Sequence, residues 1–191
     1  MNNPDFYIIT GASGAGKSTL IAALRELGHS TVPEAALEVM RAHPKYSGKL
    51  IPPSDRAVFM EKVLDRSILD HEAAQSMKPP VFFDRGIPEW LRFVERDVKL
   101  RYMAASQCSY AGTVFLAEPW PEIYVNDNER IASFERAARS YDQTVSAYIE
   151  AGFKTCVIPK VSVHERAVFI LERVGECTMR EPNIELITNE K

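Results

Sequence analysis

The chain has 191 residues, of which 46% are hydrophobic and 26% are charged, so its length and composition are typical of one globular domain with a sizeable core. Its formal net charge of −3 provides no basic field, which excludes general binding to a nucleic-acid backbone or an anionic membrane surface. The first residues lack a targeting signal and no apolar run is long enough to span a bilayer, so we expect a cytoplasmic protein.

A glycine-rich loop directly follows the first predicted strand, residues 6–10. It reads GASGAGKST over residues 11–19 and opens a helix predicted for 16–27. In this setting the backbone N–H groups and the helix start converge on a phosphate, Lys17 reaches the β and γ oxygens, and Ser18 binds Mg²⁺. The sequence therefore predicts a nucleotide site formed by Gly11, Ser13, Gly14, Ala15, Gly16, Lys17, Ser18 and Thr19.

A second strand at 29–32 leads into a short helix at 34–40. Glu34, where they meet, has two interpretations: a base that takes the proton of an acceptor hydroxyl, or an acid that favours the helix dipole. The proline-rich loop 43–53 is a candidate flap over a ligand. The next helix, predicted for 54–77, should direct three apolar side chains toward the core: Phe59, Val63 and Leu69.

The third strand, residues 81–84, is a continuous apolar run that ends in an acid. Such a run suits a buried parallel strand, so Asp84 should face a ligand at the end of the sheet. We expect it to hold Mg²⁺ directly or through water, the alternative being a helix cap. Arg85 carries a planar guanidinium with several N–H donors. We expect it to bind an acceptor anion or the transferred phosphoryl group rather than to lie at a solvated surface position.

A fourth strand at 113–117 precedes a loop at 118–128 that we interpret as the base of a lid. Arg130 follows this loop and is the preferred candidate for a catalytic arginine that closes over the phosphates. Arg136 and Arg139 are alternatives, although solvated helix charges explain them slightly better. The helix that follows should pack along one stripe, formed by Phe134, Ala138, Tyr141, Val145 and Tyr148.

The fifth strand is predicted for 154–158, and a capping box formed by Ser162 and Glu165 opens the last helix. Its inward residues should be Val163, Ala167, Ile170 and Val174. Alternating strands and helices predict an α/β fold with a parallel five-stranded sheet, helices on both faces and a ligand site at the carboxyl ends of the strands. We assign residues 1–175 to one domain with a lid around 119–136, and 176–191 to a tail.

Several segments resemble the small AAA-labelled predicted ATPases of the P-loop kinase-like group: GASGAGKST, VPEAALEV, FFDRGIPE, NDNER and the final stretch AGFKTCVIPKVSVHERAVFILERV. More distantly, the chain is similar to thymidylate, deoxynucleoside and ribosylnicotinamide kinases. The resemblance implies a three-layer fold with sheet order 2-3-1-4-5, a metal-linked Asp84, an acceptor-contacting Arg85, a lid arginine at Arg130, and adenine near residues 159–161. The deoxynucleoside kinases carry an acidic-Arg-Ser motif where this chain has Asp84-Arg85-Gly86.

Two classes of function remain open from the sequence. The first is an ATP- and Mg²⁺-dependent phosphotransferase that acts on a small acceptor such as a nucleoside or nucleotide, with Lys17, Glu34, Asp84, Arg85 and Arg130 as its catalytic residues. The second is a nucleotide-dependent switch or slow ATPase that binds a macromolecular partner. A pocket for the acceptor would favour the first, and a flat exposed apolar patch would favour the second.

Overall fold

One parallel five-stranded sheet organises the computed structural model, which describes residues 5–46, 51–94, 109–124 and 134–178. The strand order is β2-β3-β1-β4-β5, with neighbouring strands paired in parallel. The strands are β1 (Phe6–Gly11), β2 (Ser30–Val32), β3 (Val81–Asp84), β4 (Thr113–Ala117) and β5 (Lys154–Val157). This order confirms the predicted architecture, with β1 in the centre and β3 beside it.

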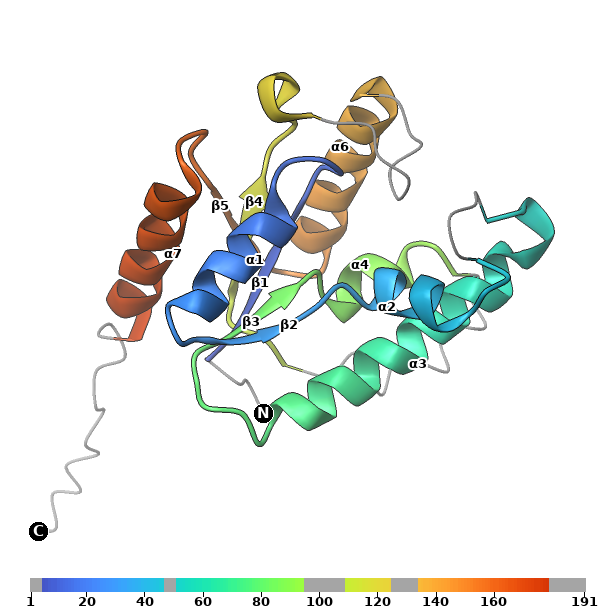
Figure 1. Cartoon of the computed structure of the whole chain (residues 1–191), viewed down its shortest axis with the longest axis horizontal. Coiled ribbons are helices and arrows are strands. Elements are labelled where there is room, and N and C mark those ends of the chain that lie inside the picture. Colours follow the sequence, from blue (N-terminus) through green and yellow to red (C-terminus); the bar gives the residue numbers. More distant parts are fainter. Residues whose placement is uncertain (1–4, 47–50, 95–108, 125–133, 179–191) are drawn as a thin grey trace, which may run out of the picture.

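Helices cover both faces of this sheet (Figure 1). Helices α1 and α7 pack against each other on one face, and α3, α4 and α6 cover the other. Their bounds are α1 (Lys17–Glu26), α2 (Ala35–Ala42), α3 (Arg56–Ala74), α4 (Ile87–Leu91), α6 (Phe134–Glu150) and α7 (Val163–Thr178). Short 3₁₀ turns lie at Pro53–Asp55 (η1) and Pro121–Ile123 (η3). Among the described helices, none is both long and apolar enough to cross a membrane.

Alternation along the strands divides the core into two layers. Phe6 and Ile8 of β1 belong to the layer under α3, α4 and α6, whereas Tyr7 and Ile9 belong to the layer under α1 and α7. Successive side chains of a strand point to opposite faces, so one apolar strand supplies both layers. The four side chains are at most 3% exposed, which explains why β1 is a continuous apolar run.

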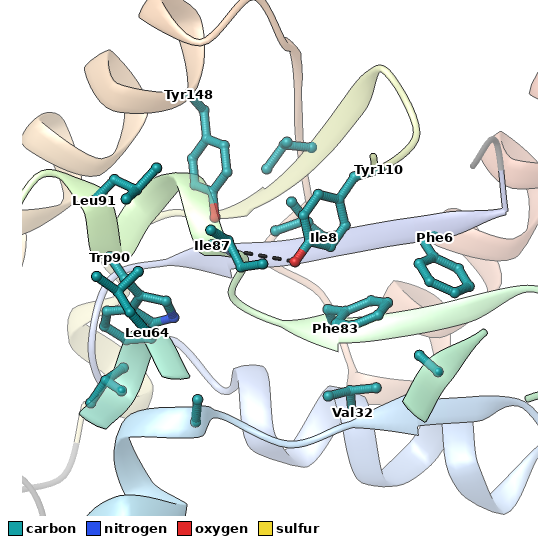
Figure 2. Packing of buried hydrophobic residues seen from close by; sticks show 14 of the residues in the cluster. Phe6, Ile8, Val32, Leu64, Phe83, Ile87, Trp90, Leu91, Tyr110 and Tyr148 are labelled. Carbon is teal, nitrogen blue, oxygen red and sulfur yellow. Dashed lines mark hydrogen bonds between the residues drawn. The ribbon is translucent and has the colours of Figure 1, made fainter. Parts of the chain in front are cut away.

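Two buried tyrosines hold the turn between β3 and α4 (Figure 2). The hydroxyl oxygen of Tyr148 accepts a hydrogen bond from the backbone N–H of Gly86 at 3.0 Å, and that of Tyr110 accepts one from Ile87 at 3.4 Å. A Cβ on Gly86 would lie 2.5 Å from Cδ1 of Ile8, so the turn approaches β1 too closely for a side chain. This close approach favours glycine at the turn.

Two predicted core positions were wrong. Leu69 is 61% exposed, because six residues at 100° each place it about 240° around the helix from buried Val63. Val163, the first residue of α7, is 37% exposed, and the buried face of that helix begins one turn later at Ala167. In α6, Tyr148 of the predicted stripe is buried, and Tyr141 and Val145 pack partly buried against the core. Ala137 and Thr144 are buried as well, so the buried face includes residues that the prediction did not name.

The capping box of the last helix is confirmed. Glu165 accepts a hydrogen bond from the backbone N–H of Ser162 at 3.0 Å, and the N–H of Glu165 donates to the Ser162 hydroxyl at 3.3 Å. Such reciprocal bonds satisfy donors that a helix start leaves open. Helix α7 then continues to Thr178, three residues beyond the domain end that we assigned from the sequence.

Candidate active site

The loop between β1 and α1 packs tightly against the end of β4. Gly11 has φ +128°, and a Cβ at this position would lie 2.1 Å from the carbonyl oxygen of Ala117. The N–H of Ala12 donates to that same carbonyl at 2.9 Å. The first backbone bond into α1 runs from Leu20 N–H to the carbonyl of Gly16 at 3.1 Å, and the N–H groups before it are the open donors of a helix start.

Lys17 is buried inside this loop, with 6% of its surface exposed. Its Nζ donates to the carbonyl oxygen of Ala12 at 2.7 Å and lies 3.3 Å from that of Gly11. Burial, followed by the nearby positive charge of Arg85, lowers the pKa of Lys17 to about 8. An anion in the loop would offset this penalty, so the site is electrostatically prepared for phosphate.

A cavity of about 120 Å³ brings three predicted residues together. Ser18 at the start of α1, Glu34 before α2 and Asp84 at the end of β3 all line it, with Arg25 and Arg41 also contributing to its wall. The residues meet because β3 lies between β1 and β2 in the sheet, so the carboxyl ends of these strands are adjacent. Glu34 is the N-cap residue of α2 but makes no side-chain cap hydrogen bond, and its side chain is 17% exposed.

Asp84 fits a metal-linked role better than a capping role. The N-cap of α4 is Gly86, and Oδ1 of Asp84 is buried and has no hydrogen-bond partner among the residues that the structure describes. Burial, followed by the charge of Glu34, raises the pKa of Asp84 to about 6. No group of three or more metal-ligating side chains occurs within the described ranges, so a cation here would need ligand oxygens as well as Ser18 and Asp84.

Arg85 lies in a buried cluster of charges next to Asp84. The backbone of Arg85 has φ +70°, an uncommon conformation for a residue with a side chain. The guanidinium lies beside two carboxylates. Nη1 pairs with Oε1 of Glu89, and Nε lies 3.3 Å from Oε1 of Glu34. Burial acts to lower the pKa of Arg85, but the charges of Glu89 and Glu34 outweigh it and raise the pKa.

Glu89 is the residue of this cluster that sequence reasoning missed, because in the sequence it stands among other charged residues, such as Arg92. Only 1% of it is exposed, and it accepts hydrogen bonds from Thr10 at 2.5 Å and Thr144 at 3.3 Å. The sequence feature that could have identified Glu89 is its position four residues after Arg85, because side chains at this spacing on a helix can form an ion pair. Its contact with Thr144 explains why a polar residue occupies the buried face of α6.

We expect that replacing Glu89 by alanine lowers the free energy of unfolding by about 3 kcal/mol or prevents folding, because it leaves Arg85 buried with one carboxylate fewer. Urea unfolding of the variant measures this loss. Glu150→Ala, at an exposed position on α6, is the matched control and should change the free energy by less than about 0.5 kcal/mol. Equal stability of the two variants would show that Glu89 does not anchor Arg85.

A second, very small cavity of about 10 Å³ lies on the other side of Asp84. Its lining includes Pro33, Arg85, Trp90 and Tyr110. Trp90 is 6% exposed and packs in the core. The two cavities share Pro33 and Asp84 in their linings, so they adjoin at this edge of the sheet.

Of the predicted lid arginines, Arg136 and Arg139 do not line either cavity. Arg130 and half of the predicted lid at 119–136 lie outside the described residues, as does part of the predicted flap at 43–53. Arg136 and Arg139 are exposed on α6. Lys160, in the segment that the resemblance places near adenine, is exposed and lies 3.7 Å from Glu118.

Solved structures with the same fold are P-loop kinases. The deoxyadenosine kinase of M. mycoides, solved with dCMP and dCDP, is 15% identical with a TM-score of 0.57, covering 90% of this chain and 98% of that one. The shikimate kinase of Acinetobacter baumannii, solved with shikimate, is 17% identical with a TM-score of 0.53, covering 92% and 95%. The NadR protein bound to NR is 14% identical with a TM-score of 0.66, covering 93% of this chain, which spans about half (52%) of NadR.

The sequence itself also matches a known family. No curated protein matches it. The family model described as AAA domain, however, matches residues 6–166, which include the phosphate loop, Asp84, Arg85 and Arg130. Since this match spans most of the sequence, the chain belongs to the AAA domain family, and its fold is that of the P-loop kinases.

Proposed function

We propose that the chain is an ATP- and Mg²⁺-dependent phosphotransferase that acts on a small acceptor. The observation that carries this proposal is the cavity at the carboxyl ends of β1 and β3, where Ser18, Glu34 and Asp84 meet beside the phosphate loop. A loop for the nucleotide, a carboxylate for the metal and a second carboxylate for the acceptor are the parts that phosphoryl transfer requires. These neighbouring positions favour transfer to a bound acceptor over simple hydrolysis.

Each residue of the site has a distinct proposed role. Lys17 and the N–H groups of residues 13–19 bind the β and γ phosphates. Arg85, held by Glu89, faces an anionic group of the acceptor or the transferred phosphoryl group. Glu34, held beside Arg85, takes the proton of the acceptor hydroxyl.

Ser18 and Asp84 are the residues that would hold Mg²⁺. The unpartnered Oδ1 of Asp84 and the Ser18 hydroxyl are oxygen donors in one cavity, which is the ligand chemistry that Mg²⁺ prefers. When bound, the ion neutralises charge that develops on the phosphates. Arg130, in the proposed lid at 119–136, would close over the phosphates, and residues 1–175 would act as one domain followed by a tail at 176–191.

The acceptor is expected to be a small hydroxyl- or phosphate-bearing molecule. Kinases of the same fold carry deoxynucleotides or shikimate in the structures described above, which supports this size of acceptor. The lining of the cavity carries both signs of charge, from Arg25 and Arg41 and from Glu34, Glu38 and Asp84. A polar acceptor that offers both a hydroxyl and an anionic group matches these walls.

An acceptor screen tests the proposal. ADP release is measured with ATP and Mg²⁺ in the presence of nucleosides, nucleotides and small hydroxy acids, and compared with the rate without an acceptor. At least one class should raise the rate by tenfold or more, with Glu34→Gln abolishing the increase. A rate that no acceptor changes would favour the nucleotide-dependent switch or slow ATPase.

Nucleotide binding should also take up a proton at alkaline pH. Lys17 has a pKa of about 8 in the free protein, so at pH 8.5 it is mostly neutral, and a phosphate anion beside it favours the charged form. We expect an uptake of about 0.7 proton per ADP at pH 8.5 without metal, and a smaller uptake by Lys17 at pH 6.5. Calorimetry in buffers of different ionisation enthalpy measures it. Equal uptake by Lys17→Met would assign the proton to another group.

A further inference from the structure

Arg166, on α7, contacts the phosphate loop from the side opposite Asp84. Its Nη2 donates to the carbonyl oxygen of Ala15 at 3.0 Å. The guanidinium also lies over the ring of Trp120, with Cζ 5.7 Å from the ring centroid, so α7, the loop and the segment after β4 meet at this side chain. A Cβ on Gly16 would lie 2.8 Å from Nη1, which places the guanidinium directly against the Ala15–Gly16 peptide.

The charge of Arg166 lacks a counterion among the described residues. Only 4% of the residue is exposed, and its Nε is buried without a hydrogen-bond partner. Within the described ranges, no carboxylate forms an ion pair with it. Burial lowers its pKa, and no charged group is among the causes of that shift. Buried arginines are usually paired, so a guanidinium in this position indicates that the site becomes complete with an anion bound nearby.

The bond to Ala15 has a geometric consequence for the loop. A trans peptide is planar, and its C=O and N–H point in opposite directions. By holding the carbonyl of Ala15 toward α7, Arg166 turns the N–H of Gly16 away from α7. In a phosphate loop the N–H groups of this segment converge on the anion, so the orientation of one peptide decides whether one donor is available.

We propose that Arg166 is a positioning residue for nucleotide binding, which fixes the Ala15–Gly16 peptide with a charged donor from behind the phosphate loop. The inference rests on the proposed function only in that the loop binds nucleotide phosphates. The buried charge contributes positive potential at the loop, and the bound polyphosphate balances it. Acceptor binding and the chemistry at Glu34 and Asp84 do not depend on this contact.

Three substitutions separate the parts of this role. Arg166→Lys keeps a charged donor, Arg166→Gln keeps a donor without the charge, and Arg166→Met keeps neither. Arg173→Met, at an exposed position on the same helix, is the matched control. The dissociation constant of ADP is measured by calorimetry for each folded variant, together with thermal unfolding in the absence of ligand.

We expect the dissociation constant of ADP to rise at least about tenfold in the Met and Gln variants, because a hydrogen bond from a charged donor is lost in each. The Lys variant should remain within about threefold of the wild type, and the Arg173 control within about twofold. The effect on AMP should be smaller than that on ADP, because AMP places fewer charges in the loop. A residue that only supports the packing of α7 would change unfolding without changing the affinity of folded protein for ADP.

An unchanged affinity of Arg166→Gln for ADP would overturn the proposal, and so would an unchanged affinity of folded Arg166→Met. If the Met variant does not fold, the Gln and Lys variants decide the matter. Absence of ADP binding by the wild type would overturn the proposed function and this inference together. Wild-type binding that the Gln change leaves intact would overturn this inference alone.

Discussion

Lys17→Met is expected to lower phosphoryl transfer by at least about 10²- to 10³-fold while leaving the protein folded. The side chain is buried and, within the described part of the chain, bonds only to the carbonyls of Ala12 and Gly11. Burial penalises its charge and lowers its pKa to about 8. Methionine has a similar length and carries no charge, so the ligand-free protein should lose little stability. Single-turnover kinetics with ATP and Mg²⁺ measure the loss in rate.

A matched control is Lys78→Met, which changes an exposed lysine before β3. This variant should retain the wild-type rate within about twofold, and both variants should unfold within a few degrees of the wild type. A rate for Lys17→Met within threefold of the wild type would remove Lys17 from the phosphate site. Unfolding of Lys17→Met alone would instead assign the lysine a structural role.

Asp84→Asn is expected to raise the stability of the free protein and to lower the rate of phosphoryl transfer. The pKa of Asp84 is raised to about 6 in the folded protein, against 3.8 as its ordinary value. Between these pH values the folded state binds more protons than the unfolded state, so the free energy of unfolding falls as the pH rises. The loss of stability that the buried carboxylate causes is complete above about pH 6. Asparagine should therefore stabilise the free protein at pH 8 by on the order of 2 kcal/mol, with the gain vanishing near pH 4.

The same change should lower Mg²⁺-dependent transfer by about 10²-fold and raise the Mg²⁺ concentration needed for half-maximal rate, because a carboxylate ligand is lost. Asp142→Asn, at an exposed position on α6, is the control and should change neither property. Thermal unfolding at pH 4 and pH 8 and a Mg²⁺ titration of the rate measure the two effects. Identical Mg²⁺ dependence of wild type and Asp84→Asn would exclude the metal role.

The parts of the site that are local in sequence could be predicted. The phosphate loop is a run of consecutive residues between a strand and a helix, so its spacing alone identifies it. Asp84 could be placed because it ends an apolar run, and parallel strands bring their carboxyl ends to one edge. The alternation of strands and helices predicted the parallel sheet, and the strand order followed from the family resemblance.

The parts that depend on distant packing could not be predicted. Glu89 meets Thr10 across 79 residues, and Arg166 meets Ala15 across 151. In the sequence both look like ordinary helix charges among other charges, and only the fold buries them. The wrong placement of Leu69 has a simpler origin, since a few apolar residues at loose spacing do not define one face of a helix.

The fate of the γ-phosphate of ATP tests the central claim most directly. Wild-type protein and Lys17→Met are incubated with γ-labelled ATP, Mg²⁺ and the acceptor classes of the screen, and the label is followed into products. We predict that the wild type transfers label to an organic acceptor faster than it releases labelled inorganic phosphate, and that Lys17→Met does neither. Label that appears only as inorganic phosphate with every acceptor, at a rate the acceptors do not change, would contradict the account.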